Sequence, residues 1–209
     1  IIYYYFRYIE KKLYKVSDYI ACMTKKNIDY ITEHNFIPQK KLYILPNWKK
    51  INDELLNSKS NISIRKKLNL VDKFVILFGG VIGIAQELDF ILNVAKKIQD
   101  KSDIIFLIIG EGNQKEKLSQ IIVREKLVNV IMFDRIPRSD FRLLTEECDL
   151  GLVCLNRNFT IPNLPSKSLD YFEAKIPVLA SIDRSTDFGD FLDESGGGLW
   201  SYTGDEKNF

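Results

Sequence analysis

Glycines at the end of an apolar run are the first residues in this chain that could do chemistry. The segment FGGVIG occupies 78–83, directly after such a run, and Gln86 lies in the helical turn expected next. Glycines at a strand-to-helix turn let backbone N–H groups approach an anion, and a helix N-terminus adds about half a positive charge. The spacing does not match GxGxxG or the P-loop pattern, so a tight chain reversal explains the segment equally well.

A second candidate is the segment GEG at 110–112, which follows the strongly apolar run 104–109. In an open parallel sheet, ligands bind beyond the carboxyl ends of the strands. Glu111 could therefore accept a hydrogen bond from a ligand hydroxyl. The same carboxylate could instead stabilise the start of the helix that follows, and the sequence leaves both roles open.

The third candidate is TIPNLPSKSLDY at 160–171. Pro165 disfavours a helix before it, and Ser166 is a natural cap for the helix that follows. Lys167 adds positive charge at the mouth of this helix, and Asp170, one turn further on, is placed to bind ribose hydroxyls. Any capped helix has similar features, so a purely structural role also remains open.

Elements that could position these segments follow from the hydrophobic pattern, in which short apolar runs alternate with longer amphipathic runs. This alternation is typical of a parallel sheet with helices on both faces. Strands are expected at 19–23, 42–45, 74–78, 104–109, 130–133, 150–154 and 178–180, with a short edge strand at 198–202. Helices are expected at 27–33, 88–98, 114–126, 139–147 and 166–174. The fold class is therefore α/β, with a doubly wound parallel sheet.

A boundary is expected after the second strand. Pro46 and Asn47 stop that strand, and the stretch 49–67 is polar and weakly periodic. We expect a strand-helix-strand remnant at 1–47, a linker at 48–72 and the doubly wound domain at 73–209.

Composition excludes few classes of function. The 209 residues are 45% hydrophobic and 28% charged, with a formal net charge of +2, so no general attraction to nucleic acid is expected. Three cysteines without paired spacing predict buried thiols. The apolar opening run is too short to span a bilayer. Two roles are open for the aromatic and basic helix around it: contact with an anionic membrane surface, or packing against another part of the protein.

Six segments, taken in order, resemble the C-terminal half of glycosyltransferase family 4, the donor-binding half of a GT-B fold. They are LPN at 45–47, FGGVIG at 78–83, IGEG at 109–112, VNVIMF at 128–133, ECDLGLV at 147–153 and PSKSLDY at 165–171. The PSK form of the last segment is most similar to the branch that acts on bacterial capsule, O-antigen and exopolysaccharide sugars. The resemblance implies a Rossmann-like domain at 73–209, truncated at its C-terminal end, and a tail of the acceptor-binding domain at 1–47.

The resemblance also implies which residues bind a nucleotide-diphosphate sugar. The glycine turn and the helix mouth would face the diphosphate, main-chain groups after the fifth strand would line the base, and Asp170 would bind the ribose. The residues so assigned are Gly80, Ile82, Gly83, Gln86, Glu111, Arg135, Ile136, Pro165, Ser166, Lys167 and Asp170. Family members need no divalent metal, and no catalytic residue is assigned to this half.

The implied activity is retaining transfer of a sugar, an N-acetylated amino sugar, to a lipid-linked or growing polysaccharide. UDP is the default nucleotide, and GDP stays open. The implied setting is the cytoplasm, with peripheral contact to the inner face of the membrane as an option, and the fragment alone is expected to be inactive.

Several positions depart from the family pattern. Val81, Ala85 and Gln86 stand where a basic residue is common. The two glutamates expected eight positions apart are represented by Pro162 and the shorter Asp170, and Glu87 and Lys175 replace glycines. The alternative is therefore a degenerate binding or assembly module that no longer holds donor.

Overall fold

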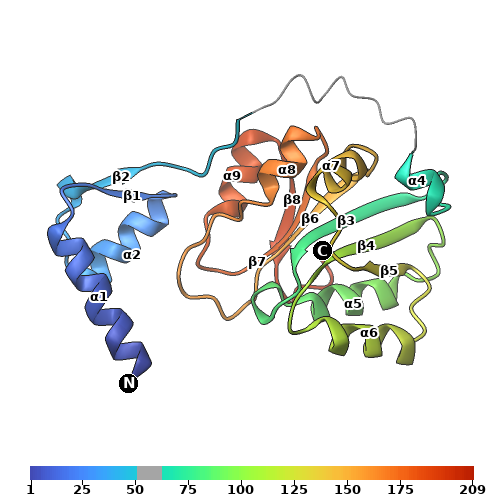
Figure 1. The fold of residues 1–209 in the computed structure, drawn as a ribbon, viewed down its shortest axis with the longest axis horizontal. Coiled ribbons are helices and arrows are strands. Elements are labelled where there is room, and N and C mark those ends of the chain that lie inside the picture. The colour runs from blue at the N-terminus through green and yellow to red at the C-terminus, as the bar shows by residue number, and fades with distance from the viewer. Residues whose placement is uncertain (51–62) are drawn as a thin grey trace.

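The computed structural model describes residues 1–50 and 63–209, which form a small N-terminal part and a larger α/β domain (Figure 1). The N-terminal part contains α1 (Ile2–Val16), β1 (Ile20–Cys22), α2 (Lys25–Asn35), the 3₁₀ turn η1 (Gln39–Lys41) and β2 (Leu42–Ile44). Strands β1 and β2 pair in parallel, and α2 packs on them through a small cluster of Cys22, Ile28 and Leu42. This part is the strand-helix-strand unit expected from the sequence.

The larger domain is built on one six-stranded parallel sheet with the order β5-β4-β3-β6-β7-β8. Its strands are β3 (Phe74–Val81), β4 (Ile104–Glu111), β5 (Val130–Phe133), β6 (Leu150–Cys154), β7 (Val178–Ile182) and β8 (Gly198–Tyr202). Between them lie α4 (Ile64–Lys67), the 3₁₀ turn η2 (Ile84–Gln86), α5 (Leu88–Lys97), α6 (Lys115–Arg124), α7 (Arg138–Glu146), α8 (Ser168–Glu173) and α9 (Phe188–Ser195). The sheet order reverses between β3 and β6, so this is a doubly wound sheet with its switch point there.

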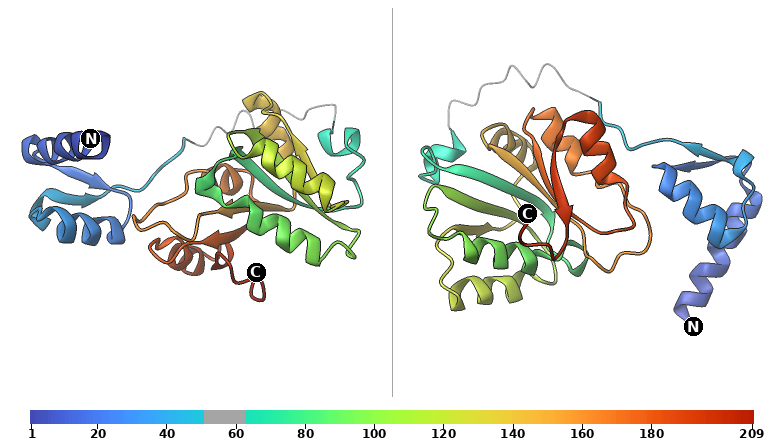
Figure 2. Two further views of the ribbon diagram at one scale, coloured as in Figure 1. Left: turned by 90° about the horizontal axis from the view of Figure 1, so that it is seen from below. Right: turned by 180° about the vertical axis from the view of Figure 1, so that it is seen from behind.

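Helices cover both faces of the sheet, with α5 and α6 on one face and α7, α8 and α9 on the other (Figures 1 and 2). Successive strand residues point to opposite faces. In β3, Val75 and Leu77 join the core under α7, α8 and α9, whereas Ile76 and Phe78 join the core over α5 and α6. Burial on both faces explains why the strands read as continuous apolar runs in the sequence.

The switch point is a split between two neighbouring strands. β3 pairs with β6 only at Ile76–Leu150 and Leu77–Gly151, and beyond these pairs the two strands diverge. The buried Tyr171 of α8 bridges the split. Its hydroxyl accepts from Gly79 N at 3.2 Å and lies 3.0 Å from the carbonyl oxygen of Leu77 in β3 and 3.3 Å from that of Leu152 in β6.

Hydrogen bonds join the N-terminal part to the larger domain. Lys26 Nζ donates to Thr186 O at 2.7 Å, and Asn27 Nδ2 donates to Pro162 O, also at 2.7 Å. Asn47 Nδ2 donates to Leu164 O at 3.2 Å, so the segment after β2 is held against the loop that precedes α8.

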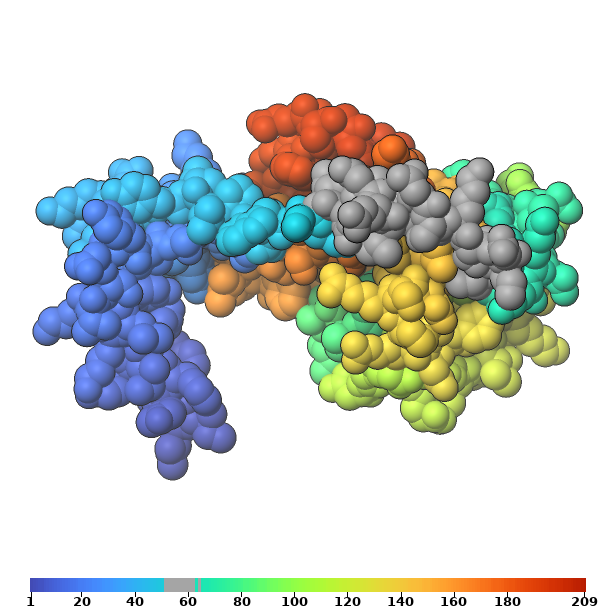
Figure 3. Space-filling model, turned by 45° about the horizontal axis from the view of Figure 1, so that its top comes forward, coloured from blue at the N-terminus to red at the C-terminus, as the bar shows by residue number. Residues whose placement is uncertain are grey.

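Helix α1 extends away from the larger domain in the space-filling view (Figure 3). None of its residues is buried, and the side chains of Tyr3, Tyr4, Tyr5, Phe6 and Tyr8 are exposed, whereas Tyr14 is partly buried. In the two described stretches of chain, no helix is both long and apolar enough to cross a membrane.

Most expected elements are present, with ends that match or shift by up to three residues, and the expected edge strand is β8. Four details differ. Gly79 and Gly80 lie inside β3 rather than in a turn after it, because β3 continues beside β4 to Val81. α8 begins at Ser168, two residues later than expected, and the expected cap Ser166 is exposed. α9 was not expected, and the end of the expected linker contains the short helix α4.

The remaining sequence expectations concern single residues. The three cysteines are free and buried, as expected. Glu87 and Lys175, which stand where the resemblance implies glycine, adopt φ angles of 43° and 60°, in the left-handed region that favours glycine.

Tyr171→Phe tests the bridge across the split. The ring still packs on the strands, but the bonds to β3 and β6 are lost, so we expect the free energy of unfolding to fall by about 1–3 kcal/mol. Urea unfolding measures this change. Tyr43→Phe, on the half-exposed Tyr43 of β2, is the matched control and should change the value by less than about 0.5 kcal/mol. Equal effects of the two substitutions would show that the bridge contributes nothing.

Candidate functional site

A cavity of about 410 Å³ opens at the carboxyl ends of β3 and β4, next to the switch point. We call it the β3–β4 cavity. Its lining residues are Gly79, Gly80, Val81, Ile109, Gly110, Glu111, Arg135, Ile136, Arg138, Phe141 and Asp170. They come from the ends of two strands, the loop after β5, the first turns of α7, and α8. The position is where an open α/β sheet binds ligands.

Two glycines shape the floor of this cavity. Gly80 has a φ of 143°, a conformation that other residues rarely adopt, and it is exposed to the cavity. A Cβ on Gly110 would lie 1.8 Å from the carbonyl oxygen of Gly80, so only glycine lets β4 approach β3 here. The result is bare backbone, without side chains, at the centre of the site.

Lys167 reaches the same place from the opposite side of the split. Its Nζ would lie 3.6 Å from a Cβ on Gly80 and sits 4.0 Å from the centre of the Phe78 ring. Nζ has essentially no solvent-exposed surface and donates no hydrogen bond to another described atom. An ammonium over an aromatic face gains some cation–π stabilisation, but this does not replace the hydrogen bonds lost from water.

Burial therefore disfavours the charged form of this lysine. It lowers the pKa of Lys167 to about 8 from an ordinary value of 10.5. At neutral pH the side chain still carries its charge, without a counter-ion among the described residues. An anion that binds next to this unpartnered ammonium and the exposed backbone can form charge-assisted hydrogen bonds, which are stronger than neutral ones.

Glu111 ties the end of β4 to the loop after β5. Its carboxylate pairs with Lys115 at 2.8 Å and accepts from the backbone N–H of Arg135 at 3.4 Å. Lys115 also pairs with Asp134, and the two carboxylates together raise the pKa of Lys115. Glu111 therefore helps to place the main chain of Arg135 and Ile136 on the cavity wall.

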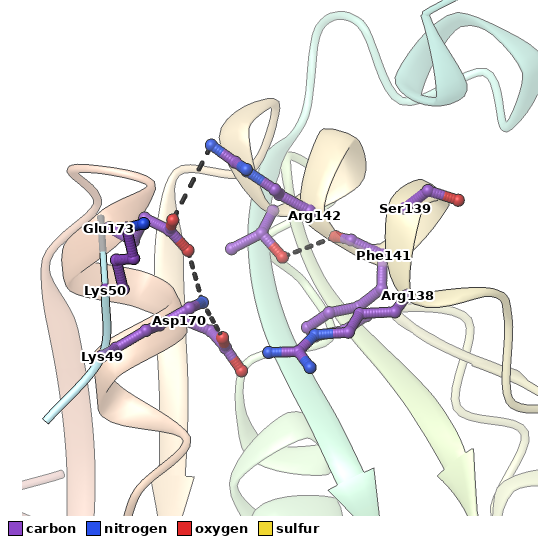
Figure 4. Close-up of a pocket in the computed structure, with 9 residues that line it drawn as sticks. Lys49, Lys50, Arg138, Ser139, Phe141, Arg142, Asp170 and Glu173 are labelled. Atoms are coloured by element: carbon purple, nitrogen blue, oxygen red, sulfur yellow. Dashed lines mark hydrogen bonds and ion pairs between the residues drawn. The ribbon is translucent and has the colours of Figure 1, made fainter. Parts of the chain in front are cut away.

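Asp170 lines the β3–β4 cavity and also a second cavity of about 380 Å³. We call the second one the α7–α8 cavity. Its lining residues are Lys49, Lys50, Arg138, Ser139, Phe141, Arg142, Thr145, Asp170 and Glu173 (Figure 4). Lys49 pairs with both Asp170 and Glu173, and Arg138 points from α7 toward Asp170.

The structure brings together six of the residues chosen from the sequence. Gly80, Glu111, Arg135, Ile136 and Asp170 line the β3–β4 cavity, and the ammonium of Lys167 lies beside Gly80. They come from β3, β4, the β5–α7 loop and the segment after β6, which the doubly wound order brings to one edge of the sheet.

The other chosen residues do not line this cavity. The Ile82 side chain is completely buried, and its N–H donates to Glu111 O at 2.8 Å, so it is part of the core. Gly83 lines a separate cavity of about 280 Å³, and its N–H donates to Gln86 Oε1 at 3.2 Å. The side chain of Gln86 therefore closes this turn, and the structure does not bring Gly83 or Gln86 into the lining of the β3–β4 cavity.

Pro165 and Ser166 are also outside the lining. Pro165 is buried, and its carbonyl accepts from Ser168 Oγ at 2.8 Å. Ser166 is exposed and precedes the helix. Lys167 does not line the cavity either, but its buried ammonium lies beside Gly80, which does.

Sequence reasoning missed two contributors to the site. Phe141 covers β3, where a Cβ on Gly79 would lie 2.0 Å from the ring, and its only signal was an apolar position on an amphipathic helix. Lys49 lies in a polar stretch with no pattern that links it to Asp170. Across the part of the chain that is described, no group of three metal-ligating side chains is positioned to hold a metal ion.

An open doubly wound α/β domain with a ligand crevice at its switch point is the class of protein that these features define. Its family is shown by sequence. The model of the family described as glycosyl transferases group 1 matches residues 60–191, more than half of the chain, and the chain belongs to this family.

Named relatives fit this assignment. The chain is 24% identical over 124 residues to WbjE of Pseudomonas aeruginosa, named as a glycosyltransferase; the match covers 59% of this chain and 31% of WbjE. It is 25% identical over 155 residues to WcaI of Escherichia coli, named as a colanic acid biosynthesis glycosyl transferase, covering 73% of this chain and 38% of WcaI.

Solved structures show the same fold. HepE of Anabaena, in a complex with UDP, superposes with a TM-score of 0.77 at 15% identity, covering 94% of this chain and 53% of HepE. WaaG, a glycosyltransferase involved in lipopolysaccharide biosynthesis, superposes with a TM-score of 0.72 at 15% identity, covering 90% of this chain and 50% of WaaG. The chain thus spans about half the length of these proteins.

Lys167→Met tests whether the buried ammonium destabilises the fold. Because the pKa of Lys167 is lower in the folded than in the unfolded state, the full cost is present below pH 8 and disappears as the pH rises toward 10.5. Methionine removes this cost, so we expect the variant to be more stable by about 2–3 kcal/mol at pH 7. The gain should shrink steadily between pH 8 and pH 10.

Chemical unfolding of both proteins across this pH range measures the gain. Lys101→Met, at an exposed lysine, is the control and should change stability by less than about 0.5 kcal/mol. A Lys167→Met variant that is less stable at every pH would mean that the ammonium has a stabilising partner.

Proposed function

We propose that this chain supplies the donor site of a retaining glycosyltransferase that uses a UDP-sugar. The observation that carries the proposal is the buried ammonium of Lys167 beside the bare backbone of Gly80, at the switch point of the sheet. A diphosphate provides the anion that this ammonium lacks. Family membership supports the reaction class, and HepE, which has the same fold, has been crystallised with UDP and with UDP-glucose.

The proposed donor lies along the β3–β4 cavity. Lys167 and the backbone at Gly80 bind the diphosphate, and the main chain of Arg135 and Ile136 lines the base. Asp170 accepts hydrogen bonds from the ribose hydroxyls. Glu111 holds the base-binding loop through its contact with the backbone N–H of Arg135. Neither a metal ion nor a catalytic side chain from this chain is invoked.

The proposal also assigns a role to each part of the chain. Residues 1–47 form the tail of the acceptor-binding domain, residues 48–72 connect it to the donor domain, and residues 73–209 hold the donor. The transferred sugar is an N-acetylated amino sugar, which the PSK segment favours, and the acceptor is a growing saccharide or a lipid-linked one. We expect the chain by itself to bind donor without transferring sugar.

A degenerate binding or assembly module is the second candidate. One observation favours it: Pro162 stands where the family has a glutamate, and its carbonyl accepts from Asn27 of α2. That position is used to join the N-terminal part to the larger domain. The two candidates differ in a simple way, because only the first binds a nucleoside diphosphate.

Isothermal titration with UDP, UDP-glucose and GDP separates the candidates. We expect the chain to bind the uridine ligands, with UDP tighter than GDP. Lys167→Met should weaken UDP binding by about 10- to 100-fold, because a charged hydrogen bond of about 1.5–3 kcal/mol is lost. Lys101→Met is the control and should bind as the unmodified chain does.

Two outcomes would count against the donor site. No binding of any nucleotide at millimolar concentration would favour the assembly module. Unchanged UDP affinity in Lys167→Met would place the diphosphate elsewhere.

A further inference from the structure

Lys49 makes an ion-pair bridge that the proposed donor site does not use. Its Nζ lies between the carboxylates of Asp170 and Glu173, both on α8 (Figure 4). Residues three apart in a helix share one face, so a single ammonium can reach both. Lys49 itself belongs to the segment after β2, far from α8 in the sequence. The bridge therefore connects the segment that joins the two parts of the chain to a residue of the donor cavity.

The two carboxylates play different parts in this bridge. The Glu173 side chain is only 6% exposed and also lies 3.8 Å from Arg142 Nη2, so it is a fixed anchor inside the domain. The Asp170 side chain is 41% exposed and faces the cavity. An exposed aspartate is free to change rotamer unless a contact holds it. Lys49, at 24% exposure, supplies that contact.

Charge and hydrogen bonding hold the lysine in place. Burial works against its charge, but the hydrogen bonds to Asp170 and Glu173 outweigh burial and raise the pKa of Lys49. Two residues earlier, the side-chain amide of Asn47 donates to Leu164 O, so a second contact also anchors the segment. Lys49 is thus charged at neutral pH. Its ammonium is held by the two carboxylates, and its chain segment is held by the contact of Asn47.

The pair with Lys49 uses one carboxylate oxygen of Asp170, Oδ1. An ionised carboxylate has two oxygens and about four acceptor sites, so it can accept from an ammonium and from hydroxyl groups at once. A carboxylate held in one orientation binds a ligand hydroxyl more tightly than a free one, because its rotamer freedom is already lost.

We propose that Lys49 is a positioning residue that holds the Asp170 carboxylate in the orientation that receives the ribose hydroxyls of the donor. This inference rests on the proposed function, since it assigns Asp170 to the ribose. It also means that the linking segment and the ribose subsite form one unit. A ligand that binds Asp170 strengthens the docking of the segment, and docking strengthens ligand binding by the same factor.

A ligand pair separates positioning from simple charge. UDP and 2′,3′-dideoxy-UDP carry the same phosphates, but only UDP has the hydroxyl groups that Asp170 binds. Removing the charge of Lys49 weakens both ligands by long-range electrostatics. Loss of positioning weakens UDP alone. The difference between the two losses therefore measures the positioning effect, in the manner of a double-mutant cycle.

The experiment measures both affinities by isothermal titration of the chain carrying Lys49→Ala, Lys49→Gln, Lys49→Arg or Lys50→Ala. We expect Lys49→Ala and Lys49→Gln to weaken UDP by about 10-fold and the dideoxy ligand by about 2-fold. Lys49→Arg keeps a cation that can reach both carboxylates and should recover most of the UDP affinity. Lys50→Ala, which changes a lysine that lines the same cavity, should bind both ligands as the unmodified chain does.

Each other outcome overturns the inference in a recognisable way. Equal losses of affinity for the two ligands would show that Lys49 acts only through its positive charge and does not position Asp170. Tighter UDP binding in Lys49→Ala and Lys49→Gln shows that the lysine competes with the ribose and blocks the site. Unchanged affinity leaves Asp170 correctly placed without it. Failure of the unmodified chain to bind UDP removes the donor site itself, and with it this role of Lys49.

Discussion

The split between β3 and β6 is the feature on which the rest of this structure depends. The two strands share only two residue pairs before they diverge, and the backbone beyond those pairs has lost one neighbour. Tyr171 compensates for this loss, because its hydroxyl bonds to both strands from α8. α8 is thereby fixed over the split, with Lys167 just before it and Asp170 within it. The same contacts that close the core also place the polar groups of the site.

Placing Lys167 in the split brings stability and binding into opposition. Its ammonium is buried against Phe78, and burial lowers its pKa to about 8. Burying an unpaired ammonium lowers the stability of the fold. The same burial strengthens the attraction between this ammonium and a bound anion, because little water screens the pair. The family position that often carries a basic residue holds Val81 here, which is exposed. In the proposed site, Lys167 supplies from the β6 side of the split the charge that the β3 side lacks.

The sequence was sufficient for most of the fold, because strands buried on both faces read as apolar runs and the helices between them are strongly amphipathic. It also predicted that Glu111, Lys167 and Asp170 come together, because a doubly wound sheet brings the end of β4 and the segment after β6 to one edge. The sequence did not predict features that depend on contacts between residues far apart in the chain. Gly80 reads as a turn residue but pairs with β4 inside a long strand, and Gly83 forms a turn closed by Gln86. Nothing in the sequence around Lys49 indicates that it contacts Asp170, 121 residues away.

In the proposed site, the diphosphate of a nucleotide sugar supplies the anion that the buried ammonium of Lys167 lacks. NMR titration of the lysine side chain, with ¹³C at Cε and Lys167→Met to assign the signal, measures its pKa directly with and without UDP-glucose. We expect a pKa of about 8 in the free chain and a rise to about 10 or higher when the ligand is bound, because a diphosphate favours the charged form. The same pKa in both states, with UDP-glucose bound, would contradict it.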